Sequence, residues 1–175
     1  MEAARSEGIL ENNGHPEGLL APPGIEHIVK DPKQPMTVYL FIRREGELDP
    51  EDRHWTVLWV LPRSDAKPGQ VVVRILEIVR EINHPHLTNW GPLARIRRAE
   101  SMEKALIAIG ELSFAERQAL EKIAKNTPVY RPNGVYNCQH WVIDVLSQAI
   151  HDIPSFGRTS IEEILRVNGR PGLLW

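Results

Sequence analysis

Runs of apolar residues, separated by polar turns in the first half of the chain, predict a series of strands. Residues 36–42 (Met-Thr-Val-Tyr-Leu-Phe-Ile) and 54–61 (His-Trp-Thr-Val-Leu-Trp-Val-Leu) are rich in the β-branched and aromatic side chains that favour extended backbone. Residues 70–78 form a third such run, which we expect to pair with the second as a hairpin. Shorter runs at 93–98 and 105–109 indicate two further short strands.

The second half of the chain changes to helical spacing. Ser113 and Glu116 form a capping box, which predicts a helix that runs to about Lys125. Residues 138–150 and 160–167 carry apolar side chains at helical intervals and predict two more helices. Strands followed by helices indicate an α+β fold, in which a small antiparallel sheet packs on C-terminal helices.

The N-terminal residues 1–35 differ from the rest in composition. Glycine and proline recur there, and apolar residues show no sustained period. We therefore expect an extended or flexible N-terminal arm that wraps the surface, with apolar patches at Ile9–Leu10 and at 19–21 that dock onto the body. Residues 36–175 are expected to form a single catalytic-like domain.

Composition and charge argue against a nucleic-acid-binding protein, a disulfide-rich protein and a membrane-spanning protein. The 175 residues include 21 Lys and Arg against 23 Asp and Glu, so a net charge of -2 gives no general attraction to nucleic acid, and we expect no nucleic-acid partner. A single cysteine excludes an internal disulfide framework. Because no apolar run is long enough for a transmembrane segment and the N-terminus lacks a signal-peptide core, we expect a soluble cytoplasmic protein.

That cysteine, Cys138, falls at the start of a predicted helix, after a turn at residues 131–134. The positive end of the helix dipole and the free N–H groups of the first turn favour thiolate over thiol. The same N–H groups can stabilise an oxyanion. The alternative is an inert structural cysteine, because free cysteine is among the most buried residue types.

Two short motifs resemble known thiol enzymes. Residues 137–142 (Asn-Cys-Gln-His-Trp-Val) resemble the Asn-Cys-Glu-His-Phe-Val signature of the lecithin:retinol acyltransferase and phospholipase/acyltransferase family, and also the cysteine signature of PPPDE-type deubiquitinase-like peptidases. Residues 53–57 (Arg-His-Trp-Thr-Val) resemble the acyltransferases' His-Trp strand. Both families belong to the circularly permuted NlpC-type, papain-like thiol hydrolases, whose histidine precedes the cysteine. The resemblance covers residues 36–150 and implies a permuted papain-like core.

The resemblance implies that Cys138 is the nucleophile and His54 the general base and acid, with no cofactor and no metal. In the acyltransferases, a second histidine on the following strand orients the first. Arg74 lies nearest to that place here, and a guanidinium cannot accept a hydrogen bond. A Cys–His dyad, a backbone carbonyl or Glu77 therefore remain as alternatives. Arg74 is either a partner for a substrate carboxylate or oxyanion, or a surface charge.

Three neighbours of Cys138 have expected supporting roles. Asn137 is expected to cap the helix, Gln139 to lie near the oxyanion, and Tyr136 to line the pocket. His140 is expected to pack and hydrogen-bond, because side chains at i and i+2 on a helix point apart.

Two other groups of residues carry weaker signals. His84 and His86 lack the accompanying ligands of a zinc site, so a loop role is favoured over metal binding. Arg95, Arg97 and Arg98 indicate a solvated strand face.

The expected activity is that of a cysteine-dependent acyl hydrolase or acyltransferase. A Cys–His pair attacks a carbonyl and forms a thioester acyl-enzyme. The expected substrate is an acyl-containing small molecule, lipid or peptide. The alternatives are a PPPDE-like isopeptidase that acts on ubiquitin-like tails, and a non-catalytic binding module that retains the fold.

Overall fold

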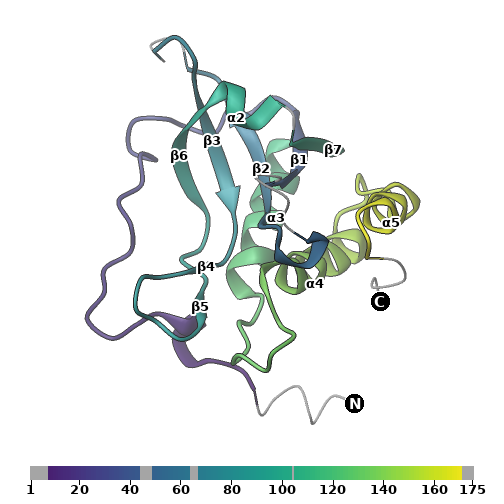
Figure 1. Cartoon of the computed structure of the whole chain (residues 1–175). Helices are drawn as coiled ribbons and strands as arrows, with labels where there is room; N and C mark the ends of the chain where they lie inside the picture. The colour runs from purple at the N-terminus through teal and green to yellow at the C-terminus, as the bar shows by residue number, and fades with distance from the viewer. Residues whose placement is uncertain (1–7, 44–48, 64–66, 104, 171–175) are drawn as a thin grey trace.

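The computed structural model describes residues 8–43, 49–63, 67–103 and 105–170. Its centre is an antiparallel sheet of five strands (Figure 1). In spatial order the strands are β6 (Leu93–Arg98), β3 (Gln70–Leu76), β2 (Trp55–Leu61), β1 (Met36–Ile42) and β7 (Leu106–Leu112). All five predicted strands are confirmed, and so is the hairpin pairing of β2 with β3.

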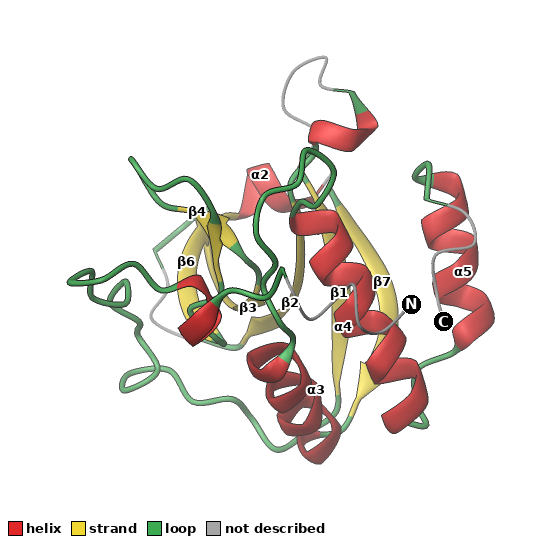
Figure 2. Ribbon diagram, turned by 90° about the horizontal axis from the view of Figure 1, so that it is seen from below, coloured by secondary structure: helices red, strands yellow, loops and turns green. Residues whose placement is uncertain are grey.

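Four α-helices form within the described residues. Two of them, α3 and α4, cover one face of the sheet, whereas α5 packs beside β7 (Figure 2). The helices are α2 (Ala99–Glu103), α3 (Phe114–Asn126), α4 (Cys138–Asp152) and α5 (Arg158–Val167). The α+β class is therefore confirmed, and the predicted capping box of Ser113 and Glu116 starts α3.

The two faces of the sheet have separate cores, because successive side chains of a strand point to opposite sides. Trp55, Val57 and Trp59 face the helices and belong to the larger core. Leu58 belongs to a smaller core on the other face, where Met102 of α2 packs against it. The short helix α2 was not predicted, nor were the two-residue strands β4 (Val79–Arg80) and β5 (Leu87–Thr88).

The N-terminal arm, as far as it is described, lies against the body (Figure 1). It begins with a short 3-10 helix, η1 (Glu11–Gly14), beside which Leu10 packs on the larger core. Further along, Asp31 pairs with the fully buried Arg117 of α3. The predicted docking of residues 19–21 is wrong, because Leu20 is 87% exposed, and the arm packs on the larger core through Leu10, Ile25 and Val29 instead.

No described helix is both long and apolar enough to cross a membrane. A second 3-10 helix, η2 (Pro50–Asp52), lies just before β2 and leads into the candidate site.

Candidate active site

His54 and Cys138 come together although they lie far apart in the sequence. His54 immediately precedes β2, and Cys138 is the first residue of α4, which packs against β2. The pKa of each side chain is shifted by its interaction with the other, and Sγ of Cys138 lies 3.9 Å from the carbonyl oxygen of Arg53, the residue before His54. The structure therefore places the predicted nucleophile beside the predicted base.

Glu77, which directly follows β3, extends this pair to a third residue. Its Oε2 accepts a hydrogen bond from Nε2 of His54 at 2.9 Å and one from the Thr56 hydroxyl at 2.8 Å. Because Val57 pairs with Leu76 in the β2–β3 register, Glu77 lies opposite Thr56. Because Nε2 of the His54 ring is hydrogen-bonded to the Glu77 carboxylate, Nδ1 is the ring nitrogen left to interact with the thiol.

The pKa values of the three groups show how each supports the others. Burial lowers the pKa of His54, but the hydrogen bonds with Cys138 and Glu77 outweigh it and raise the pKa to about 10. Burial raises the pKa of Cys138, but the hydrogen bond with His54 and those from the N–H groups of Trp55 and of Cys138 itself bring it below its usual value. The arrangement favours the thiolate–imidazolium pair over the neutral thiol and imidazole.

The Glu77 carboxylate is held ionised by the same contacts. Its burial raises the pKa, whereas the hydrogen bonds from His54 and Thr56 lower it, and the net direction is downward. A buried carboxylate that stays charged stabilises the imidazolium next to it.

The start of α4 is fixed by its own sequence. The side chain of Asn137 accepts hydrogen bonds from the N–H groups of Gln139 and His140, which confirms the predicted cap. In return, Nδ1 of His140 accepts a hydrogen bond from the Asn137 N–H at 3.3 Å. His140 thus has the structural role that its spacing from Cys138 indicated.

Gln139 holds the loop before His54 against the helix. Its side chain is completely buried, and its amide nitrogen donates to the carbonyls of Pro50 at 2.7 Å and Arg53 at 2.8 Å. Its amide oxygen accepts from Nε of Arg170 at 2.8 Å. The sequence prediction placed Gln139 near the oxyanion, but the amide nitrogen has both hydrogens committed to this loop.

Arg74 lies on the other side of the sheet from Glu77. Its guanidinium donates to Glu121 of α3 at 2.7 Å and to Glu26 of the arm at 3.0 Å. Three positions separate Arg74 from Glu77 along an extended chain, so their side chains point to opposite faces. The predicted partnership of Arg74 with a substrate anion is replaced by these two internal ion pairs.

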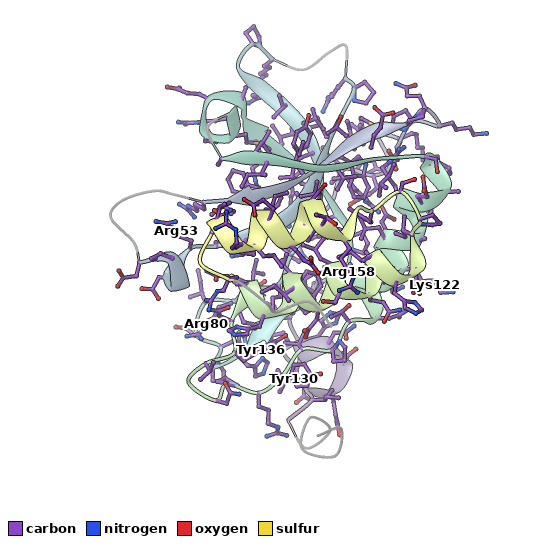
Figure 3. All side chains as sticks on the ribbon, turned by 90° about the vertical axis from the view of Figure 1, so that its right-hand side faces the viewer. Arg53, Arg80, Lys122, Tyr130, Tyr136 and Arg158 are labelled. Atoms are coloured by element: carbon purple, nitrogen blue, oxygen red, sulfur yellow. The ribbon has the colours of Figure 1, made fainter. Side chains whose placement is uncertain are left out.

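Tyr136 packs beneath the start of α4. Figure 3 shows it next to Tyr130, and the two rings meet edge to face with centroids 5.1 Å apart. Its hydroxyl donates to the carbonyl of Pro128 at 3.3 Å. Burial is the main reason that the pKa of this phenol is raised, so it stays a neutral hydrogen-bond donor.

A cavity of about 360 Å³ opens beside His54 and Glu77, on the sheet face that α3 and α4 do not cover. It is lined by apolar residues (Phe41, Leu58, Ile75 and Met102) and by polar ones (Arg43, His54, Thr56, Glu77, Arg97 and Ser101). A second cavity of about 270 Å³ adjoins it and shares Ile75, Glu77 and Arg97. A larger cavity of about 520 Å³ lies between α3 and α4, and its lining includes none of Cys138, His54 and Glu77.

Sequence reasoning missed the position of Arg97. Its Nη2 lies 3.9 Å from Oε1 of Glu77, so this residue of β6 reaches the site rather than forming only a solvated strand face. Arg97 pairs with Val71 of β3, and this register, which the sequence alone does not fix, brings it to the site. His84 and His86 lie with ring centroids 6.5 Å apart, and no group of three candidate metal ligands occurs among the described residues.

A search of protein-family models found no match to this chain. Comparisons with curated proteins and with solved structures found none either. The geometry of the site and the resemblance of its two motifs are therefore the basis for assigning a function.

Proposed function

We propose that the protein is a cysteine-dependent acyl hydrolase or acyltransferase with Cys138 as nucleophile, His54 as general base and acid, and Glu77 as the residue that orients His54. The observation that carries this proposal is that Cys138, at the start of α4, lies within electrostatic reach of His54, whose Nε2 is held by the Glu77 carboxylate at 2.9 Å. A nucleophile, a base and an orienting group within hydrogen-bond reach are the geometric signature of covalent catalysis.

The reaction would proceed in two halves. The Cys138 thiolate attacks the carbonyl carbon of an ester, thioester or amide, and the C=O electron pair moves onto oxygen. When that pair returns, the bond to the leaving group breaks, the leaving group takes a proton from the His54 imidazolium, and a thioester remains. Water or an amine then attacks the thioester and gives a proton to His54, and the Cys138 thiolate departs.

The backbone around the sulfur supports this chemistry. The N–H groups of Trp55 and Cys138 both lower the pKa of the Cys138 thiol, so they lie next to the carbon–sulfur bond that would form. Donors that are fixed in place before the reaction stabilise a developing oxyanion without reorganisation. We assign these two N–H groups, rather than the Gln139 side chain, to the oxyanion.

The order of the elements also supports a permuted papain-like core. The histidine stands at the start of a sheet strand, and the cysteine follows it in the chain, on a helix that packs against that strand. This order agrees with the resemblance of residues 53–57 and 137–142 to the permuted NlpC-type enzymes. The PPPDE-like isopeptidases share the same nucleophile and base, so substrate tests separate them from the acyltransferases.

Intact-protein mass spectrometry tests the proposal. We expect the hexanoyl thioester of N-acetylcysteamine to add one hexanoyl group to the wild type, because Cys138 is the sole cysteine. Cys138→Ser should give no thioester adduct, and His54→Gln should acylate far more slowly. If the wild type forms no adduct with this thioester or with a ubiquitin-tail thioester, and Cys138 alkylates like a free thiol, the protein is a binding module.

A further inference from the structure

The cavity beside His54 has an apolar floor, and Arg97 lies among the polar residues of its lining. Phe41, Leu58, Ile75 and Met102 supply the apolar surface. Its volume of about 360 Å³ lies at the lower end of the range for small-molecule sites, in which apolar walls bind the ligand and a few polar groups orient it. A chain of several methylene groups suits the floor of such a cavity.

Among the described residues, the charged side chains that line this cavity are those of Arg43, His54, Glu77 and Arg97. The Glu77 carboxylate accepts from His54 at 2.9 Å and lies 3.9 Å from Arg97, so its closer partner is His54. A guanidinium that faces an apolar cavity favours a ligand that brings a negative charge.

Arg97 is the residue best placed to hold that charge. Its side chain is 45% exposed, and its 3.9 Å separation from Glu77 is longer than a hydrogen bond. The contrast with Arg74 is informative, because Arg74 is 16% exposed and donates to two carboxylates at hydrogen-bond distance. The Arg97 guanidinium therefore keeps donors for a carboxylate, which it can bind with two parallel hydrogen bonds.

We propose that this cavity binds a carboxylate of the substrate through Arg97, so that the preferred substrates are anionic acyl compounds. The inference rests on the proposed function, because it places the anion beside the reacting histidine. The carboxylate can belong either to the acyl chain or to the leaving group, and the experiment separates the two sources.

Three thioesters test the preference by their rates of acylation. We compare the hexanoyl and adipoyl thioesters of N-acetylcysteamine, which differ in a terminal carboxylate, with the hexanoyl thioester of mercaptoacetate, whose leaving group carries the charge. We expect one of the two anionic thioesters to react at least about tenfold faster than the neutral one, the size of a charge-assisted contact. Arg97→Gln should bring that ratio close to one.

Arg98→Gln is the matched control, because Arg98 follows Arg97 on β6 and points to the other face of the sheet. It should keep the wild-type ratio. Equal rates for all three thioesters in the wild type, or an unchanged ratio in Arg97→Gln, would overturn the anion site and leave the proposed function intact.

A binding measurement separates this inference from catalysis. Calorimetric titration of adipate into Cys138→Ser should show binding that Arg97→Gln weakens about tenfold or more and Arg98→Gln does not. If none of the thioesters acylates the wild type while adipate binds in this way, the proposed function fails and the anion site stands. If adipate does not bind and the charged thioesters have no advantage, the anion site fails.

Discussion

Glu77→Gln tests the link between the orienting carboxylate and the reactivity of the thiol. The substitution keeps the shape of the side chain and an oxygen that can accept from Thr56 or His54, but it removes the negative charge that lies 2.9 Å from Nε2 of His54. We expect the imidazolium to lose stabilisation, the pKa of His54 to fall, and the pKa of Cys138 to rise with it.

The size of the effect follows from the strength of that contact. A hydrogen bond to a charged group contributes roughly 1.5–3 kcal/mol. One pH unit corresponds to about 1.4 kcal/mol, so the midpoint for thiolate formation should rise by about one to two pH units. At a pH below both midpoints, the alkylation rate should therefore fall by roughly 10- to 100-fold.

The assay is the pH–rate profile of iodoacetamide alkylation, followed by mass spectrometry at Cys138. Glu121→Gln is a matched control, since Glu121 is 13% exposed against 16% for Glu77, but its carboxylate pairs with Arg74 instead. This control should keep the wild-type midpoint. If Glu77→Gln also keeps it, Glu77 is a structural partner of His54 and does not tune the thiol.

Three further predictions concern stability. Cys138→Ser is nearly isosteric and should change the free energy of unfolding, measured by urea denaturation, by less than about 1 kcal/mol. Trp141→Ala removes a fully buried ring of the same helix and should cost about 3–5 kcal/mol. Equal losses for the two variants would mean that Cys138 is structural. Asp31→Asn leaves the buried Arg117 without its charged partner and should cost about 3–5 kcal/mol by the same method, and a loss under about 1 kcal/mol would refute that estimate. Because the pKa of His54 is raised to about 10, its ion pairing stabilises the fold fully below about pH 6.5, and this stabilisation is lost as the pH rises through about 10. The difference in unfolding free energy between wild type and His54→Gln should therefore shrink over that interval. A constant difference would contradict the shift.

The parts of the fold that depend on local sequence were predictable. The strands 36–42 and 54–61 have long β-branched and aromatic runs, and the caps at Ser113 and Asn137 use side chains within three residues of the N–H groups that they satisfy. The short helix α2 was missed because its five residues are stabilised by the burial of Met102 against the sheet, which is a tertiary contact.

The third member of the site depended on register, which a single sequence does not fix. Arg74 and Glu77 both lie near the place where an orienting residue was sought, and only the pairing of Val57 with Leu76 sets Glu77 opposite Thr56 and leaves Arg74 on the helix side. Arg97 likewise lies at the site because of the register in which β6 pairs with β3. The role of Gln139 was also hidden, because the carbonyls that it binds come from a loop more than eighty residues earlier.

The two hydrogen bonds from Gln139 make the reactive thiol dependent on local folding. They tie the first turn of the nucleophile's helix to the loop that leads into His54, so neither segment can open without separating sulfur from imidazole. Local opening costs less free energy than global unfolding, and it would return Cys138 to the modest reactivity of a solvated thiol before the sheet itself is lost. A chain that is still folding, or has begun to unfold, would therefore not carry an activated nucleophile, and alkylation of Cys138 becomes a direct gauge of how often this corner of the molecule opens.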